Sequence, residues 1–314
     1  MKPIDAVILW VDGSDPAIVS KHKQYSVESS ELKRNDIGGI ARYTDNREIE
    51  YCVSSILTFA PFIRNIFIIT DNQDPGLDDM LNTHFPDGKT SVKIIDHKVI
   101  FRDYEHFLPS FNTNSLETMM WRIPNLSEQF VYFNDDVFLA APTNEEDFFS
   151  KNGLPIGYWR PINRRIAGMF NFFKKGMGFK HFIINSARMI NADIIPLLGH
   201  TPMPLTRSGF KRIFEQHPEW MELNLKDRFR NPRQFNPQAL YYLMEPNVRR
   251  DFIDLRIFFK PKASKSGYMA RKIRQADKMR HLLFGCINSF EECNETERQL
   301  FYSWFTKRLN NVYS

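Results

Sequence analysis

Short apolar segments that each end in a polar, acid-rich loop constrain the fold of this chain most. Residues 4–11, 65–70 and 130–133 are β-rich and apolar, which is typical of buried strands. The loops that close them are Asp12-Gly13-Ser14-Asp15-Pro16, Asp71-Asn72-Gln73-Asp74-Pro75 and Asn134-Asp135-Asp136. Because open α/β sheets bind their ligands at the carboxyl ends of strands, we expect these loops to lie at one functional edge.

Helical periodicity between the apolar segments indicates an α/β protein. Apolar side chains recur at helical spacing over residues 49–60, after Asp45 and Glu48, which are placed as in a capping box. Residues 91–96 are typical of a further strand, and residues 112–123 of a helix. The order β, α, β, β predicts a Rossmann-like, mostly parallel sheet.

The second half of the chain predicts a different arrangement. We divide the sequence into a Rossmann-like region at residues 1–150 and a mainly helical C-terminal lobe at residues 151–314 that completes the site. Helices are expected at residues 179–190, 206–216, 237–244, 272–283 and 295–309.

Composition excludes several classes of protein. A chain of 314 residues with 42% hydrophobic residues can bury a large core, so it is not disordered. Its apolar runs are strand-sized, far below the ~20 residues that cross a bilayer, and residues 1–5 are unlike a signal peptide. Cys52, Cys286 and Cys293 have no CxxC spacing, which indicates reduced, structural thiols. We therefore expect a cytoplasmic protein.

The formal net charge of +5 comes from basic clusters spread through the chain. Most of these clusters are interpreted as solvated surface, and we expect no nucleic-acid partner. The cluster at residues 260–274 is of the kind that contacts anionic lipids, which predicts peripheral contact with the inner face of the cell membrane.

Two acidic positions are candidates for holding a metal ion. Asp135 and Asp136 follow an apolar segment, and paired carboxylates in such a loop can hold a hard divalent cation against a pyrophosphate. The alternative is that one of them caps a turn and the other is solvated. Glu117 precedes the same strand and could point at the same pocket, although a surface helix acid is the alternative.

Basic side chains in the second half are candidates for proton transfer and phosphate binding. His200 lies in Gly199-His200-Thr201-Pro202, which we expect to be a loop between two helices, where an imidazole can act as a general base. Arg228 and Arg230 flank Phe229, and a guanidinium suits bidentate contact with phosphate oxygens. The alternatives are an exposed histidine and surface ion pairs.

Taken together, these segments resemble the Stealth family, which includes bacterial capsular-polysaccharide phosphotransferases and the catalytic part of the animal lysosomal-enzyme N-acetylglucosamine-1-phosphotransferase. The resemblance covers most of the chain. It is carried by Ile4-Asp5-Ala6-Val7-Ile8-Leu9-Trp10-Val11-Asp12-Gly13-Ser14-Asp15-Pro16, Arg42-Tyr43-Thr44-Asp45-Asn46, Ile69-Thr70-Asp71-Asn72-Gln73, Tyr132-Phe133-Asn134-Asp135-Asp136, Gly199-His200-Thr201-Pro202-Met203-Pro204, Asp227-Arg228-Phe229-Arg230 and Cys286-Ile287-Asn288. After the last asparagine the family usually carries an acid, where this chain has Ser289.

The resemblance implies a glycosyltransferase-A-like catalytic region that binds a nucleotide sugar, with Mg²⁺ or Mn²⁺ as the divalent metal. The implied catalytic residues are Glu117, Asp136, His200 and Arg230. The implied metal ligands are Glu117, Asp135 and Asp136. The implied donor-binding residues are Trp10, Asp12, Asp45, Asn46, Arg228 and Asn288.

The implied reaction transfers hexose- or N-acetylhexosamine-1-phosphate from a nucleotide sugar, UDP-linked by expectation, to a hydroxyl of a growing capsular or other cell-surface polysaccharide. A phosphodiester forms and a nucleoside monophosphate leaves. Two alternatives stay open at this point. One is a metal-dependent glycosyltransferase that releases a nucleoside diphosphate, and the other is a non-catalytic carbohydrate-binding or surface-masking protein.

Overall fold

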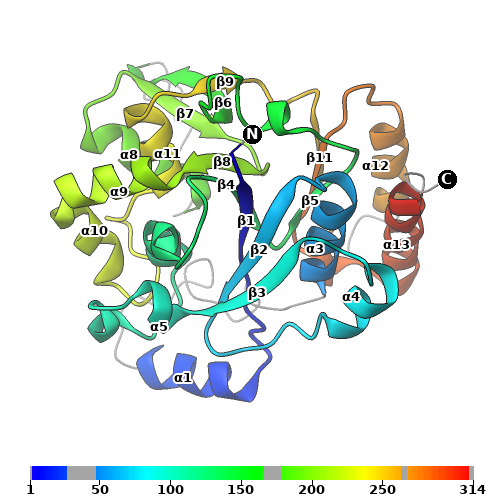
Figure 1. The fold of residues 1–314 in the computed structure, drawn as a ribbon, viewed down its shortest axis with the longest axis horizontal. Coiled ribbons are helices and arrows are strands. Elements are labelled where there is room, and N and C mark those ends of the chain that lie inside the picture. The colour runs from blue at the N-terminus through cyan, green and yellow to red at the C-terminus, as the bar shows by residue number, and fades with distance from the viewer. Residues whose placement is uncertain (1, 27–46, 166–177, 263–266, 311–314) are drawn as a thin grey trace.

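The computed structural model describes residues 2–26, 47–165, 178–262 and 267–310, and is built around one mixed sheet (Figure 1). Its strand order is β3-β2-β1-β4-β8. The first four strands are parallel, and β8 runs antiparallel to β4. The strands are β1 (Ile4–Leu9), β2 (Ile63–Thr70), β3 (Ser91–Asp96), β4 (Gln129–Asn134) and β8 (Met203–Thr206).

The central sheet is covered on both faces. Along β1, Val7 and Leu9 pack into one core, whereas Ala6 and Ile8 pack into another on the opposite face. Every residue of β1 is buried. This burial explains why β1 is continuously apolar rather than alternating between apolar and polar residues.

Helices from both halves of the chain cover the sheet (Figure 1). The first core contains side chains of α6, α8, α9, α10 and α11, and the second contains those of α3. The helices are α1 (Pro16–Ser26), α3 (Glu48–Phe59), α4 (Asp78–His84), α5 (His97–Ile100), α6 (Thr113–Met119), α8 (Phe179–Met189), α9 (Arg207–Gln216), α10 (Pro218–Leu225), α11 (Pro237–Met244), α12 (Tyr268–Asp277) and α13 (Glu295–Asn310). No helix within the described ranges is long and apolar enough to cross a membrane.

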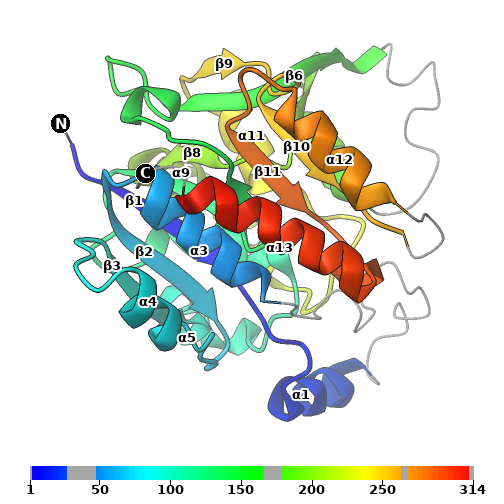
Figure 2. The ribbon, with the colours of Figure 1, turned by 90° about the vertical axis from the view of Figure 1, so that its right-hand side faces the viewer.

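Two smaller sheets complete the fold. The first has the order β10-β11-β5, and its outer face carries a third core shared with α12 and α13 (Figure 2). The second has the order β7-β6-β9. Their strands are β5 (Val137–Leu139), β6 (Ile156–Asn163), β7 (Ile194–Leu198), β9 (Val248–Arg250), β10 (Arg256–Phe259) and β11 (Phe284–Ile287).

The structure confirms the mostly parallel α/β sheet and adds strands that were not predicted. Six strands, β6 to β11, lie among the helices of residues 151–314. His200 accordingly lies between β7 and β8, so the prediction of a loop between two helices is wrong. Both strands contain a proline, Pro196 or Pro204, and each forms the edge of its sheet, where a missing N–H is tolerated.

Helix starts also differ in places from the sequence prediction. Helix α12 begins at Tyr268, four residues before the predicted start, after Gly267 in the left-handed region at φ 66°. Helices α1 and α10 were not predicted. The predicted cap Asp45 lies outside the described residues, and α3 follows Arg47 without a side-chain cap. The division at residues 150 and 151 stays a prediction, and the central sheet takes β8 from the second half.

Candidate active site

Asp136 lies in the turn between β4 and β5 and is contacted by β11. Because β11 pairs antiparallel with β5, it brings Cys286 and Asn288 to this turn. The Cys286 thiol donates to Oδ2 of Asp136 at 3.4 Å, and the Asn288 amide donates to the same oxygen at 3.5 Å. Oδ1 of Asp136 is buried and has no hydrogen-bond partner among the described residues. A buried carboxylate oxygen without a partner is unfavourable alone, so it suits a bound cation or a substrate group.

His200 faces Asp136 from the loop between β7 and β8. Its imidazole stacks on Phe258 with ring centroids 5.1 Å apart and also contacts Phe179. The loop approaches closely because the preceding residue is Gly199, where a Cβ would lie 2.9 Å from the Phe252 ring. Burial lowers the pKa of His200, although the nearby Asp136 charge acts in the opposite direction. A histidine with a lowered pKa is neutral at pH 7 and can accept a proton.

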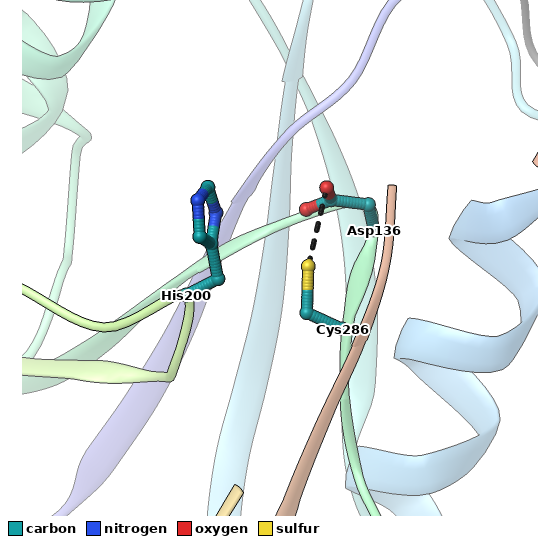
Figure 3. Close-up of side chains that lie close together, drawn as sticks. All are labelled: Asp136, His200 and Cys286. Atoms are coloured by element: carbon teal, nitrogen blue, oxygen red, sulfur yellow. Dashed lines mark hydrogen bonds between the residues drawn. The ribbon is translucent and has the colours of Figure 1, made fainter. Parts of the chain in front are cut away.

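Three side chains thereby converge from distant parts of the chain (Figure 3). One possible ligand atom from each of Asp136, His200 and Cys286 lies within 4.8 Å of the other two. Burial, followed by the charge of Asp136, raises the pKa of the Cys286 thiol well above its ordinary value. The thiol is therefore protonated, which makes it a poor metal ligand and a hydrogen-bond donor.

Glu117 forms an adjacent group with Tyr132 and Arg230. The Tyr132 hydroxyl lies 2.9 Å from Oε1 of Glu117 and 2.6 Å from Oδ1 of Asn134. Burial raises the pKa of Glu117 to about 7, while the Tyr132 hydrogen bond and the Arg230 charge act in the opposite direction. A hydroxyl has one hydrogen and cannot donate to two acceptors. A protonated Glu117 resolves this conflict, because it donates to Tyr132, which then donates to Asn134.

Replacing Glu117 with glutamine is expected to stabilise the folded protein at pH 8 by about 2–3 kcal/mol. With a folded-state pKa of about 7 against an ordinary value of 4.5, Glu117 keeps a proton that the unfolded chain has released. Stability from this group is therefore lost as the pH rises from about 4.5 to 7. Glutamine does not ionise, so it does not lose stability in this way. The stability gained by the substitution should therefore shrink toward pH 5. Denaturant unfolding of both proteins at pH 5 and pH 8 measures it.

Glu222→Gln is the matched control, because Glu222 is exposed on α10. It should change stability by less than about 0.5 kcal/mol at both pH values. An equal effect of Glu117→Gln at pH 5 and pH 8 would contradict the raised pKa.

Arg230 reaches Glu117 from a loop tied to the start of α6. The Asn112 side chain donates to the backbone oxygens of Asp227 and Phe229, both at 3.1 Å. Arg230 donates to Thr113 at 3.0 Å, which uses one of its five N–H groups. Within the described ranges its other four N–H groups form no hydrogen bond, so they can donate to a ligand.

Arg228 lies in the same loop and points toward α1. Its guanidinium lies 4.7 Å from the Tyr25 ring centroid and donates to the backbone oxygen of Leu108 at 3.3 Å. Phe229 between the two arginines is buried and stacks on Phe111. The buried phenylalanine anchors the loop. Arg228 then points toward α1, and Arg230 points toward the start of α6.

The loops after β1 and β2 are joined to each other. The Gln73 side chain donates to the backbone oxygen of Asp12 and to Oδ2 of Asp15, both at 2.9 Å. Oδ1 of Asp12 accepts from the backbone and hydroxyl of Ser14, which is turn-type hydrogen bonding. The Trp10 indole N–H is buried and donates to none of the described residues.

The structure thus brings some of the expected residues together. Asp136, His200 and Asn288 meet at the turn after β4. Glu117 lies beside Tyr132 of β4, and the Arg230 charge acts on Glu117. Asp135 and Glu117 are not part of the three-residue group around Asp136. Asp45 and Asn46 lie outside the described residues. The catalytic, metal and donor-binding roles of all these residues stay predictions.

Sequence reasoning missed the position of Cys286 and the role of Tyr132. Cys286 was interpreted as structural, yet its thiol contacts Asp136 across 150 positions of sequence. The block Cys286-Ile287-Asn288 was the signal, but only the pairing of β11 with β5 brings it to the site.

The donor set around Asp136 fits a hard cation only in part. Mg²⁺ and Mn²⁺ prefer oxygen ligands, and Mg²⁺ is commonly held by one or two carboxylates together with substrate phosphates. The unpartnered Oδ1 of Asp136 meets this need, whereas the protonated Cys286 does not. The arrangement is therefore compatible with a divalent cation bound through Asp136 and the substrate.

Comparison with known proteins defines the family. Residues 2–26 match Stealth protein CR1, conserved region 1, and residues 42–156 match Stealth protein CR2, conserved region 2. The capsular polysaccharide phosphotransferase LcbA of Neisseria meningitidis is 31% identical over 311 residues, which cover 95% of this chain and 79% of the relative. The phosphotransferase cps1A of Actinobacillus pleuropneumoniae is 33% identical over 236 residues. That match covers 74% of this chain but 62% of the relative.

The fold has a counterpart among solved structures. The apo structure of the bifunctional glycosyltransferase WbbM superimposes with a TM-score of 0.53 at 10% identity, over 99% of this chain and 51% of that chain. At this identity the likeness concerns the fold alone, which is that of a glycosyltransferase-A-like α/β protein. The sequence matches assign the family, and this chain belongs to the Stealth family.

Proposed function

We propose that this chain transfers a sugar-1-phosphate unit from a nucleotide sugar to a hydroxyl of a growing capsular or other cell-surface polysaccharide. The observation that carries the proposal is the unpartnered Oδ1 of Asp136 beside His200 at the carboxyl end of β4. In sheets of this class the ligand lies at that edge. Relatives named capsular polysaccharide phosphotransferases support the reaction type, and the donor is a UDP-linked hexose or N-acetylhexosamine in this proposal.

In the proposed reaction the acceptor hydroxyl attacks the sugar-bearing phosphorus of the donor. The bond from that phosphorus to the bridging oxygen breaks, and a nucleoside monophosphate leaves. His200 takes the hydroxyl proton, since its ring nitrogens form no hydrogen bond to a described residue. Arg230 binds phosphate oxygens with the donors that Thr113 leaves available. Catalysis of phosphoryl transfer rests largely on such positioning and charge neutralisation.

A divalent cation, held by Asp136, would neutralise charge on the donor diphosphate when it is bound. The protein's own groups around that position are donors to Asp136, from Cys286 and Asn288. These contacts hold Oδ2 of the carboxylate and leave Oδ1 for the cation.

The experiment that tests this function identifies the nucleotide released. The protein is incubated with a panel of nucleotide sugars, Mg²⁺ or Mn²⁺ and capsular oligosaccharides. We expect a nucleoside monophosphate, and we expect excess chelator to abolish turnover. Release of a nucleoside diphosphate would establish a glycosyltransferase instead. Full turnover in chelator would contradict the role of the cation.

The reaction is proposed to occur at the inner face of the cell membrane. The basic side chains of residues 260–274 support this location, and residues 263–266 of that stretch lie outside the described residues. Cell fractionation at low and high salt tests the contact.

A further inference from the structure

Arg256 at the start of β10 is a half-buried cation that pairs with no described acid. Its guanidinium lies between two rings, 4.9 Å from the Phe252 centroid and 5.2 Å from the Phe258 centroid. Its Nε is buried without a hydrogen-bond partner in the part of the chain that the structure describes. A charged group held in this way loses hydration and gains only ring contacts. An anion that accepts its N–H groups would satisfy it.

Further cations lie near Arg256. Helix α12 packs against β10, and its Lys272 is half-buried and donates to the Gln275 side chain at 3.0 Å. Burial, together with the charges of Arg256 and Arg271, lowers the pKa of Lys272. The charges of Arg256 and Lys260 also act on His200. Like charges gathered around partly buried positions repel one another, and the cluster is relieved when an anion binds among them.

Arg256 packs beside a different hydrophobic core from the residues around Arg230. Tyr132, whose hydroxyl bonds to Glu117 in the Arg230 group, belongs to the core on one face of the central sheet. Phe252 and Cys286 belong to the core on the other face, where Arg256 lies. The two arginines therefore lie beside different cores, and each can bind a separate anion.

His200 determines which substrate lies near Arg256. The base of the proposed reaction must contact the acceptor hydroxyl, and His200 stacks on Phe258, the ring that also contacts Arg256. The surface beyond His200 is consequently the acceptor side. Each sugar-1-phosphate transfer leaves a phosphodiester in the product, so a growing acceptor chain carries phosphodiesters from earlier transfers.

We propose that Arg256 and Lys272 form a second phosphate-binding subsite, which binds a phosphodiester of the acceptor chain. This inference rests on the proposed function and adds a preference among acceptors. An acceptor that already contains the phosphodiester linkage of the product is bound more tightly than one that does not. A guanidinium suits this task because it binds two phosphate oxygens at once.

The test uses two capsular fragments as probes, a single repeat unit without a phosphodiester and two units joined by one. For the unaltered protein we expect a KM about tenfold lower for the two-unit fragment. Arg256→Gln should remove this difference and leave the KM for the donor and for the single unit unchanged. Lys272→Gln should reduce the difference in part, and it provides a second variant if Arg256→Gln does not fold.

The matched control is Arg249→Gln, because Arg249 is an exposed arginine of β9 that also contacts a ring, Trp159. It should keep the preference. A preserved preference in Arg256→Gln, or a raised KM for the donor, would overturn the subsite. Calorimetric binding of both fragments without donor needs no turnover. It therefore separates failure of this subsite from failure of the proposed reaction.

Discussion

Replacing Asp136 with asparagine is expected to lower turnover by about 10²-fold or more while the protein stays folded. Asparagine keeps the volume of aspartate, so no cavity forms. Its carbonyl can accept from Cys286 and Asn288, which places the NH₂ group where Oδ1 now lies. A bound cation therefore loses its negatively charged oxygen ligand at that position. Initial rates of nucleotide release, together with a thermal melt, measure the effect.

Two further variants show whether the loss is specific to Asp136. Asp254→Asn changes an exposed acid just before β10 and should leave the rate unchanged. Cys286→Ala should cost less than about tenfold, because a protonated thiol contributes one weak hydrogen bond. Full activity of Asp136→Asn would contradict its role. Equal losses in Asp136→Asn and Cys286→Ala would instead indicate that the thiol is a ligand.

Elements with complete local signals could be predicted from the sequence. The strand at 91–96 and the helix at 237–244 have the predicted bounds, and the latter begins with an Asn236 cap and Pro237 at its first turn. The apolar segments 65–70 and 130–133 lie in buried strands, β2 and β4, because both faces of the central sheet are covered.

Elements that depend on distant partners could not be predicted. Strand β5 has three residues and β11 has four, and such short segments are strands only because they pair with each other. Helix α1 was missed because Pro16 was interpreted as a turn residue. In the structure Pro16 occupies the first helical position, and Asp15 accepts from the backbone of Ala17.

In the candidate site, too, some features follow from the local sequence and others depend on distant residues. The position of Asp136 at a strand end follows from the local sequence, since an apolar segment precedes it. The contacts with Cys286 and His200 do not, because they depend on the packing of β11 and on the loop between two unpredicted edge strands. The protonation of Glu117 also depends on burial by distant residues, which no local pattern indicates.

Replacing Arg230 with lysine is expected to reduce transition-state stabilisation by about 1–3 kcal/mol, a loss of about 5- to 150-fold in kcat/KM for the donor. Lysine keeps the positive charge beside Glu117 but loses the planar group that can donate to Thr113 and to phosphate oxygens together. The loss should appear in kcat more than in KM, because charge on the transferred phosphate is redistributed in the transition state.

Arg233→Lys is the control in the same loop, where Arg233 pairs with Asp227 at 3.5 Å, and it should keep nearly full activity. Equal activities of the two variants would mean that Arg230 contributes only its positive charge, and the bidentate phosphate contact proposed for it would be wrong.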